Sequence, residues 1–313
     1  MTTILAAIDH DDDTTILTPS LKRLVREDDE LVLLGVAPRL SEDIIHHRVV
    51  SSAKRGERAM LEALASKTER VQSTVGVKGD IDLVSGAVAR EIIKAAVLRK
   101  ADMVVKEADR LQAQSAGRPG LVERKLIKRC PATTLILQKS LEVETPRIVV
   151  AIDNPEEKDA GGDGALLRAR LMKAAIDLAK RMGAREITLL HAWKMEGLAF
   201  LQHPRSGLSE EAINQYIDEA ESLARRWLSD FCENVESKYS GEGLAFKAQL
   251  VMGERGKAIA EAANALNCDV LVIGSANRRG MQGLFFGNTA ESVVAAAACN
   301  LLVVKPEDFH TLL

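Results

Sequence analysis

The amino-acid sequence predicts an α/β protein made of two tandem domains, each a five-stranded parallel sheet with helices on both faces. The chain has 313 residues, which suits two domains of about 150 residues better than one. Short apolar runs rich in β-branched residues alternate with amphipathic helical segments, as they do in βαβ units. The two halves of the sequence also match each other, and such a repeat indicates a duplicated structural unit.

The repeat is carried by landmarks at one constant spacing. Each half opens on a similar run, ILAAID or IVVAID, that ends at an aspartate. Gly86 and Gly253 lie 167 positions apart (253 − 86), and Gly120 and Gly287 have the same spacing (287 − 120). Several landmarks at one spacing are hard to obtain by chance. We therefore expect each element of the first half to have a counterpart in the second.

Ten strands follow from the apolar runs, five in each half. They are expected near 3–9, 30–36, 75–84, 102–106 and 133–138, and near 147–153, 186–192, 245–252, 269–274 and 300–305. The last two read VLVIG and LLVVK, which is typical of strands that are covered on both faces. Helices fill the intervals between the strands.

The longest helix of the second half is expected to open at Ser209. It carries an apolar stripe at helical spacing, so we expect it to pack that stripe on its sheet. The stripe consists of Ala212, Ile213, Tyr216, Ile217, Ala220, Leu223, Ala224, Trp227 and Phe231.

Charged residues and Pro146 separate the two halves, which predicts domains at 1–142 and 143–313. Because few residues are available at this junction, we expect two sheets that pack against each other as an intramolecular pseudo-dimer. A homodimer of whole chains is a further expectation.

Composition excludes several classes of partner. The formal net charge is -3, and neither half has a long tail of one sign, so neither nucleic acid nor a membrane surface is expected as a partner. The four cysteines are scattered without a CxxC pair, which suits a reducing cytosol. No apolar run reaches the roughly 18 residues that a membrane span needs, and the first residues do not read as an export signal. A cytoplasmic protein is expected.

The candidate binding site follows from the predicted sheet. In a doubly wound sheet, ligands bind at the carboxyl ends of the strands, where the strand order reverses. The segment after the fourth strand of the second half runs from Gly274 to Gly287 and is rich in glycine. Glycine lets a chain approach a phosphate closely, and helix N-termini attract anions. Asn288 and Glu291 predict a capped helix start, so a glycine-rich connector with no ligand stays open as an alternative.

These residues resemble a motif of the universal stress protein family, G-x2-G-x9-G-[ST], which wraps the phosphates of ATP. The sequence keeps Gly274 and Gly287 at the spacing of that motif and has Asp153 where the family aspartate faces the adenosine part. It departs from the motif at Asn277 and Asn288, which replace a glycine and a Ser or Thr. With its tandem length, the chain looks most like the two-domain E type of the family. The resemblance implies Rossmann-like domains of the adenine nucleotide alpha hydrolase kind, with ATP or another nucleotide as the ligand.

The expected pocket lies in the second half and is lined by strand ends and by the start of the following helix. Its residues are Ala151, Ile152, Asp153, Ala192, Ile273, Gly274, Asn277, Gly287, Asn288 and Thr289. No catalytic residue and no metal ligand is expected among them.

The first half departs further from the motif. At the spacing of 167, Glu107 stands in the place of Gly274 and Arg110 in that of Asn277. Of the motif glycines, the first half keeps only Gly120, which corresponds to Gly287. A carboxylate at this position repels a polyphosphate and lacks the conformational freedom of glycine. We predict that the first half does not bind ATP in the manner of the family.

The sequence lacks the usual enzyme signatures, namely a Walker loop, a GxGxxG motif after a first strand, HExxH and GxSxG. The acidic run from Asp9 to Asp13 is interpreted as a solvated loop, and His191 as a packing residue. We therefore expect a non-catalytic stress-response protein with a nucleotide pocket in its second half. Two alternatives stay open: a structural or interaction module with closed pockets, and a weak ATP hydrolase.

Overall fold

The computed structural model describes residues 1–39, 47–109, 119–154, 164–195, 197–275, 287–307, 309 and 311. Its strands are β1 (Thr3–Asp9), β2 (Glu30–Ala37), β3 (Gly79–Ser85), β4 (Met103–Glu107), β5 (Thr133–Leu137), β6 (Ile148–Ala151), β7 (Glu186–Trp193), β8 (Ala245–Met252), β9 (Val270–Gly274) and β10 (Asn300–Val304). The helices are α1 (Leu17–Leu24), α2 (His47–Val75), α3 (Val88–Leu98), α5 (Leu121–Arg129), α6 (Gly164–Met182), α7 (Leu198–Leu201), α8 (Glu210–Lys238), α9 (Arg255–Ala265) and α10 (Asn288–Ala296).

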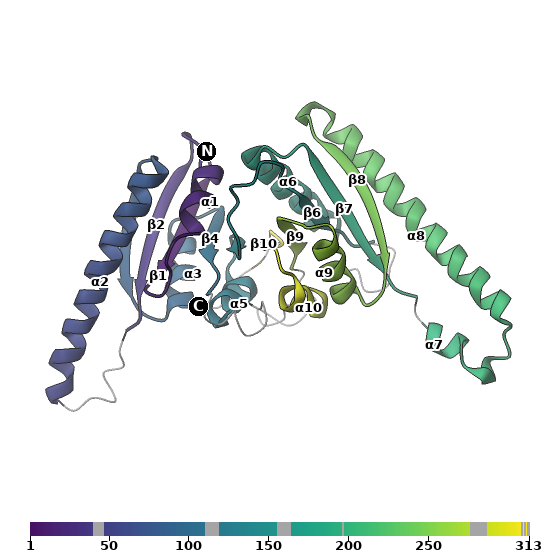
Figure 1. The fold of residues 1–313 in the computed structure, drawn as a ribbon, viewed down its shortest axis with the longest axis horizontal. Coiled ribbons are helices and arrows are strands. Elements are labelled where there is room, and N and C mark those ends of the chain that lie inside the picture. Colours follow the sequence, from purple (N-terminus) through teal and green to yellow (C-terminus); the bar gives the residue numbers. More distant parts are fainter. Residues whose placement is uncertain are drawn as a thin grey trace.

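The strands form one ten-stranded sheet in the order β3-β2-β1-β4-β5-β10-β9-β6-β7-β8. Within each half all neighbouring strands are parallel, and the strand order is the same in both halves. The halves meet where β10 pairs antiparallel with β5, with Leu301 opposite Ile136. The expectation of two separate sheets packed on each other is thus wrong, because the two edge strands pair instead. Figure 1 shows the halves on either side of this seam.

The repeat is visible in the bounds of the elements. Four elements of the first half, α3, β4, α5 and β5, fall on α9, β9, α10 and β10 when their numbers are raised by 167 (255 − 88, 270 − 103, 288 − 121 and 300 − 133). Both ends of each pair coincide. The fold class predicted from the sequence, two tandem Rossmann-like units of five parallel strands, is therefore confirmed, although the units share one sheet.

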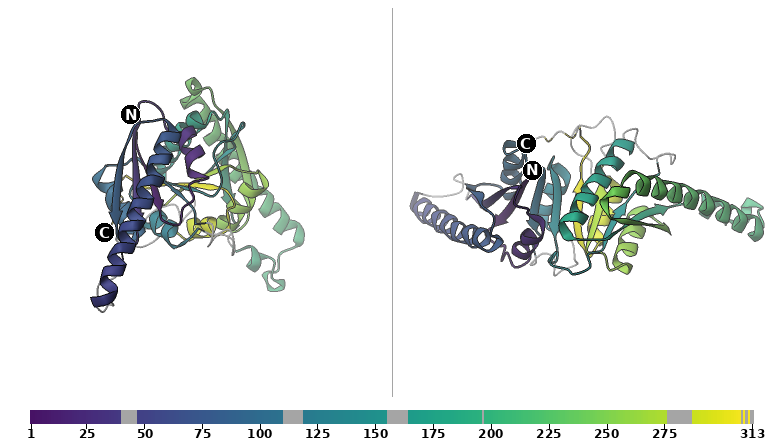
Figure 2. Two further views of the ribbon diagram at one scale, coloured as in Figure 1. Left: turned by 60° about the vertical axis from the view of Figure 1, so that its left-hand side comes forward. Right: turned by 90° about the horizontal axis from the view of Figure 1, so that it is seen from above.

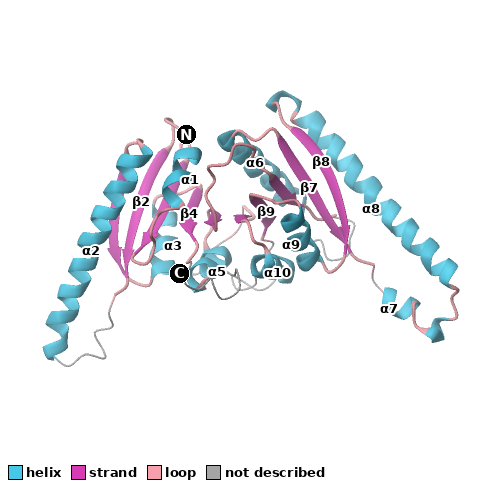
Figure 3. Cartoon of the chain, in the orientation of Figure 1, coloured by secondary structure: helices cyan, strands magenta, loops and turns pink. Residues whose placement is uncertain are grey.

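Helices cover both faces of the sheet (Figure 3). On one face, α1, α2, α6 and α8 pack over an apolar core that runs through both halves, from Ile4 and Leu64 to Ile187 and Leu228. On the other face, α3 and α5 cover one cluster, and α9 and α10 cover a second. Because the first core is common to both halves, burying its apolar surface holds the halves together as well as folding each of them.

The predicted strand positions agree with the structure to within one or two residues at most ends. The third strand is an exception, since it begins at Gly79 and not near 75. The preceding helix α2 continues to Val75, and Gly76 then ends it with a positive φ of 79°. Glycine adopts this left-handed conformation readily and commonly terminates helices.

The helix α8 opens as expected, with the hydroxyl oxygen of Ser209 accepting a hydrogen bond from the backbone N–H of Ala212 at 3.2 Å. Its apolar stripe is buried only in part. Ile213 and Ala224 are buried, whereas Ala212, Tyr216 and Leu223 are exposed. The first turns of α8 extend beyond the sheet, as do those of α2 at the opposite end of the molecule (Figure 2). The prediction that the whole stripe packs on the sheet is therefore wrong for these three residues.

A buried ion pair connects the two halves beside the seam. Arg181 of α6 pairs with Asp29, which precedes β2, and both side chains are almost inaccessible to solvent. The same guanidinium donates hydrogen bonds to the backbone oxygen of Leu24 at 2.8 Å and to the hydroxyl of Thr2 at 3.0 Å. Burial raises the pKa of Asp29, but the hydrogen bonds from Arg181 and from backbone N–H groups hold it below its ordinary value.

Among the described residues, no helix is both long enough and apolar enough to cross a membrane.

Candidate functional site

The carboxyl ends of β6 and β9 form the candidate site of the second half. The two strands are parallel neighbours, and the strand order reverses between them, so a ligand crevice is expected at this edge. Ile152 follows β6, is buried, and donates its backbone N–H to the oxygen of Leu190 at 2.9 Å. The next residue, Asp153, is exposed. On β9, Ile273 is buried and Gly274 is the last residue.

The other expected site residues are distributed unevenly around this edge. Ala151 ends β6, and Ala192 is buried on β7. Asn277 lies outside the described residues. Thr289 lies in the first turn of α10, a helix that begins at Asn288. The structure thus brings the strand-end residues to one edge of the sheet.

Gly274 is required by close packing and not by its backbone angles. A Cβ atom at this position would lie 3.0 Å from Leu167 Cδ2 and 3.2 Å from Leu171 Cδ1, both on α6. Such contacts are tighter than ordinary van der Waals distances. The glycine therefore lets α6 lie directly against the end of β9.

The start of α10 differs from the sequence expectation. Gly287 is the N-cap, and as a glycine it has no side chain that could accept a hydrogen bond from the first turn. The expected capping box at Asn288 and Glu291 is therefore wrong, and Glu291 instead pairs with Lys128 of α5. The first backbone N–H groups of a helix without a side-chain cap attract anions. Among the residues that the structure describes, none lies within 4 Å of the place that a Cβ on Gly287 would take.

A cation stands next to the aspartate of the second half. The Nη1 atom of Arg168, on α6, lies 3.3 Å from the backbone oxygen of Asp153 and donates a hydrogen bond to it. Burial lowers the pKa of Arg168, while the negative charge of Asp153 opposes that effect. A guanidinium remains charged under such a shift and is well suited to bind phosphate oxygens.

Two buried residues complete the surroundings of the strand ends. His191 has its Nδ1 atom 3.0 Å from the backbone oxygen of Ile152 and its ring 4.9 Å from that of Trp227, in agreement with the packing role inferred from the sequence. Lys305, just after β10, donates to the hydroxyl oxygen of Ser275 at 2.9 Å and to the backbone oxygen of Ile127. Burial lowers the pKa of Lys305 to about 7, against the opposing influence of Cys130.

The equivalent edge of the first half holds a buried cluster of charges, which we call the Lys106 cluster. Lys106 points from β4 between the carboxylates of Asp9, Asp12 and Glu123, with Nζ–O distances of 3.4, 2.7 and 3.9 Å. The ammonium also donates to the backbone oxygen of Glu107 at 2.7 Å. Asp9 is occupied further, because its carboxylate accepts the backbone N–H groups of the turn that follows β1.

The Lys106 cluster contains three carboxyl groups and one ammonium, so its carboxyl groups are not all paired equally well. Both carboxylate oxygens of Glu123 are buried and have no hydrogen-bond partner among the described residues. Burial raises the pKa of Glu123, and burial likewise raises that of Asp12 to about 7 although Lys106 opposes it. Burial lowers the pKa of Lys106, but the surrounding carboxylates outweigh it and raise the pKa above its ordinary value.

The acidic run after β1 is therefore partly structural. The ligand atoms of Asp9, His10 and Asp11 lie within 4.8 Å of one another, but the Asp9 carboxylate already binds backbone N–H groups and faces Lys106. Asp12 is buried against the same ammonium. The run is not simply a solvated loop, because two of its carboxylates hold Lys106.

The two halves differ in charge at equivalent positions. At the spacing of 167, Lys106 corresponds to Ile273 (106 + 167), and Glu107 and Glu123 correspond to Gly274 and Ala290 (107 + 167 and 123 + 167). The second half thus has no counterpart to these three charges. Sequence reasoning found Glu107 but missed Lys106 and Glu123. A lysine inside the otherwise apolar run MVVKE was the available signal, since a buried lysine requires a partner.

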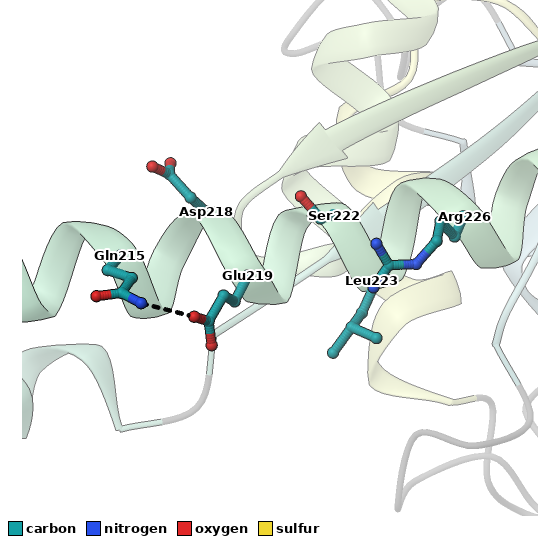
Figure 4. Close-up of a pocket in the computed structure, with 6 residues that line it drawn as sticks. All are labelled: Gln215, Asp218, Glu219, Ser222, Leu223 and Arg226. Carbon is teal, nitrogen blue, oxygen red and sulfur yellow. Dashed lines mark hydrogen bonds between the residues drawn. The ribbon is translucent and has the colours of Figure 1, made fainter.

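A separate hollow lies on the outer helix α8 (Figure 4). It is lined by Gln215, Asp218, Glu219, Ser222, Leu223 and Arg226. All six residues are on one helix, with a hydrogen bond from Gln215 to Glu219 at 3.0 Å as the interaction drawn between them. A ligand would find no opposing wall among these residues, so we do not regard the hollow as a binding site.

A family model matches the second half of the chain. The model describes the universal stress protein family and matches residues 144–305. Among curated proteins, universal stress protein E of Escherichia coli (strain K12) is 25% identical over 188 residues, which is 59% of this chain and 55% of that protein. The protein of the same name from Salmonella typhi is also 25% identical, over 187 residues and with the same shares. The matched segment spans about half the length of these relatives.

Solved structures resemble the chain over nearly its whole length. A putative universal stress protein from Pseudomonas aeruginosa UCBPP-PA14 has a TM-score of 0.65 and 19% identity, and the likeness covers 99% of this chain and 95% of that one. A universal stress protein from Archaeoglobus fulgidus has a TM-score of 0.63 and 17% identity, with 98% and 97% covered. At such identities the likeness establishes the fold.

Proposed function

The chain belongs to the universal stress protein family, and on that premise we propose that it is a non-catalytic stress-response protein of the cytoplasm whose second half binds one nucleotide. The pocket lies at the ends of β6 and β9. Its ligand is ATP or another nucleotide, and binding changes how the chain assembles or which partner it contacts.

The observation that carries the proposal is the contrast between the two halves. In the first half, Lys106 and its three carboxylates occupy the edge where a ligand would sit. In the second half, the equivalent positions of β9 and α10 hold Ile273, Gly274 and Ala290, none of which carries a charge. The three carboxylates around Lys106 repel a polyphosphate in the first half. The second half has uncharged residues at the equivalent positions, and the buried ion near its strand ends is a cation, Lys305, which contacts Ser275.

Cations and backbone donors favour a phosphate in the second half. Arg168 lies beside Asp153, and the N-cap residue of α10 is Gly287, which has no capping side chain of its own. A guanidinium and a helix N-terminus both bind phosphate oxygens. The neighbouring His191 packs against Trp227 and faces the Ile152 carbonyl, which gives it no role as a general base and supports a binding function.

Equilibrium dialysis with ATP and Mg²⁺ tests the proposal. We expect one nucleotide per chain and not two, because the first half is filled by the Lys106 cluster. We expect Arg168→Gln to weaken binding by about 10- to 150-fold, since a charge-assisted hydrogen bond contributes roughly 1.5 to 3 kcal/mol. The matched control is Arg185→Gln, because Arg185 is exposed and immediately precedes β7 at the opposite edge of the sheet.

Two other results would contradict the proposal. No uptake at nucleotide concentrations on the order of millimolar would favour the structural or interaction module. One observation supports that second candidate: Leu167 and Leu171 lie against Gly274, so that α6 reaches the end of β9. Phosphate release that is lost in Arg168→Gln would instead favour the weak ATP hydrolase.

A further inference from the structure

One buried carboxyl group in the first half has no hydrogen-bond partner. Glu123 lies in the first turn of α5 and is 1% exposed. Neither of its carboxylate oxygens is hydrogen-bonded within the part of the chain that the structure describes. An ionised carboxylate in such a place is much more costly to bury than a neutral carboxyl group. We propose that the Lys106 cluster is a proton-binding site, in which Glu123 holds one proton at neutral pH and releases it when the pH rises.

The ammonium of Lys106 has no donor left for Glu123. Its Nζ atom lies 2.7 and 2.9 Å from the two carboxylate oxygens of Asp12 and 2.7 Å from the backbone oxygen of Glu107. A lysine ammonium has three N–H donors, and these three acceptors use them all. The distance from Nζ to Glu123 Oε1 is 3.9 Å, which is too long for a hydrogen bond. The proton therefore belongs on Glu123 and not on Asp12, whose carboxylate already has its donors.

The other charges that act on Glu123 are negative. Burial raises the pKa of Glu123 most, and Lys106 opposes that effect. The carboxylates of Asp9, at the end of β1, and Asp109, after β4, raise the pKa further. Asp9 is also 3.4 Å from the Lys106 ammonium, so it shares the one positive charge of the cluster. A third ionised carboxylate would leave the cluster with excess negative charge in a buried place.

The neighbouring helices hold their charged groups in other contacts. On α3, which packs against α5, Glu91 and Lys94 pair with each other at 2.9 Å. On α2, Lys67 donates to backbone oxygens of the turn after β1. The carboxylate of Glu107 accepts the backbone N–H of Leu17, the first residue of α1, at 3.0 Å. The basic residues of α5 itself are exposed. Neutralisation by a proton is the compensation that this arrangement leaves to the buried carboxyl group.

The direction of the pH effect follows from the two pKa values. In the unfolded chain Glu123 has its ordinary pKa of 4.5, and in the folded protein its pKa is higher. Between these values the folded state binds more protons, so stability falls as the pH rises, and one proton changes the unfolding equilibrium constant by up to about tenfold per pH unit. Below the unfolded pKa the effect is absent, and above the folded pKa the loss is complete. Mild acid therefore stabilises the first half through this site.

Infrared spectroscopy of the full-length protein tests where the proton lies. A protonated carboxyl group has a C=O stretching band that an ionised carboxylate lacks. At neutral pH we expect one such band in the wild type, its absence in Glu123→Gln, and its loss from the wild type as the pH is raised. A band that persists in Glu123→Gln but is missing from Asp12→Asn would place the proton on Asp12 and overturn the proposal. A wild-type spectrum without the band would overturn it as well.

Urea unfolding at a series of pH values tests the effect on stability. Glutamine has the shape of a protonated glutamate and no charge, so Glu123→Gln should be more stable than the wild type at neutral pH. The ratio of their unfolding constants should change by up to about tenfold per pH unit above the unfolded pKa. The matched control is Glu142→Gln at an exposed position after β5, which should follow the wild type at every pH.

A second variant keeps the test decisive if the amide does not fit. Glu123→Ala introduces the residue that the second half has at the equivalent position, Ala290 (123 + 167). The smaller side chain lowers stability at every pH, but its difference from the wild type should have the same pH dependence as that of Glu123→Gln. If Glu123 were ionised and stabilised by Lys106, both variants would instead lose stability relative to the wild type as the pH rises, and the proposal would be wrong.

Discussion

Two buried lysines of this molecule have surroundings that shift their pKa values in opposite directions. Lys106 and Lys305 are both almost fully buried. Lys106 is surrounded by carboxylates, which raise its pKa despite burial. Lys305 donates to the hydroxyl of Ser275 and to a backbone oxygen, and burial lowers its pKa to about 7. Neighbouring anions therefore decide whether a buried ammonium keeps its proton.

The first prediction concerns the pH dependence of stability and uses Lys305→Met. In the unfolded chain the lysine has its ordinary pKa of 10.5, whereas in the folded protein its pKa is about 7. Between these values the unfolded state binds more protons, so stability rises with pH in this window, by up to roughly 1.4 kcal/mol per pH unit. The unfavourable contribution of the buried cation is complete below the folded pKa. We expect Lys305→Met to lack this slope.

Urea unfolding of the wild type and of Lys305→Met at a series of pH values checks this prediction. The difference between the two free energies of unfolding isolates Lys305, because other titrating groups contribute to both proteins. The difference should favour the methionine variant most at low pH and should shrink as the pH rises. Parallel curves through the window would show that Lys305 keeps its ordinary pKa.

Part of the residue-scale chemistry could be predicted from the sequence. Glu107 was found because it falls where the internal repeat has a glycine, a comparison within one chain. Glu123 could not be assigned in this way, because its burial depends on how α5 packs beside β4. The N-cap of α10 was predicted one residue too late, since an asparagine is a favoured cap and Gly287 has no side chain that signals a cap.

At the scale of elements, close approach between helices depends on single glycines. A Cβ on Gly256 of α9 would lie 2.3 Å from Ser292 Cβ and 2.7 Å from the backbone oxygen of Thr289, both on α10. Backbone at this distance must move. The two helices touch only because this position is glycine.

The second prediction compares two substitutions by alanine. Gly256→Ala should lower the free energy of unfolding by about 1 to 3 kcal/mol, because it overpacks the contact between α9 and α10. Gly56→Ala is the control, since Gly56 lies in α2 with nothing within 4 Å of its added Cβ. Gly56→Ala should raise the free energy of unfolding by about 0.5 to 1 kcal/mol, because alanine has a higher helix propensity than glycine. Chemical denaturation of both variants gives the comparison, and equal effects would contradict the packing explanation.

The positions of the elements were largely predictable, because period and composition report local structure. Continuous apolar runs predicted the strands that are covered on both faces, and Ser209 predicted the start of α8. The exposed part of α8 was not predictable in this way. Tyr216 and Leu223 belong to the same stripe as the buried Ile213 and Ala224, so helical spacing alone does not decide which residues of the stripe a neighbouring element covers.

At the scale of the whole molecule, the sheet is continuous because the two edge strands β5 and β10 pair with each other. Their sequences are apolar and would suit a buried position in any arrangement. The choice between packing two sheets face to face and joining them edge to edge depends on both halves together. Pairing the edges satisfies the backbone N–H and C=O groups that an exposed edge strand would present, which gives a physical reason for the observed arrangement.

The third prediction follows from the continuity of the sheet and of the core beneath it. We expect the two halves to unfold in one transition, because the apolar cluster under α1 and α6 runs through both. Arg181→Met removes the guanidinium from buried Asp29 and should lower the free energy of unfolding by about 3 to 5 kcal/mol, since a buried carboxylate is left without its partner. The transition should stay single, because the paired strands and the common core remain.

Two probes on opposite sides of the seam measure this behaviour. Both tryptophans, Trp193 and Trp227, lie in the second half, so their fluorescence reports that half, while hydrogen exchange of β1 and β2 reports the first. Coincident urea midpoints are expected in the wild type and, at lower urea, in Arg181→Met. Adding Asp29→Asn to Arg181→Met should restore part of the lost free energy of unfolding, because the unpaired carboxylate charge is then removed. Separate midpoints in the wild type would mean that each half folds on its own core and that the seam is only a contact between two independently folded domains.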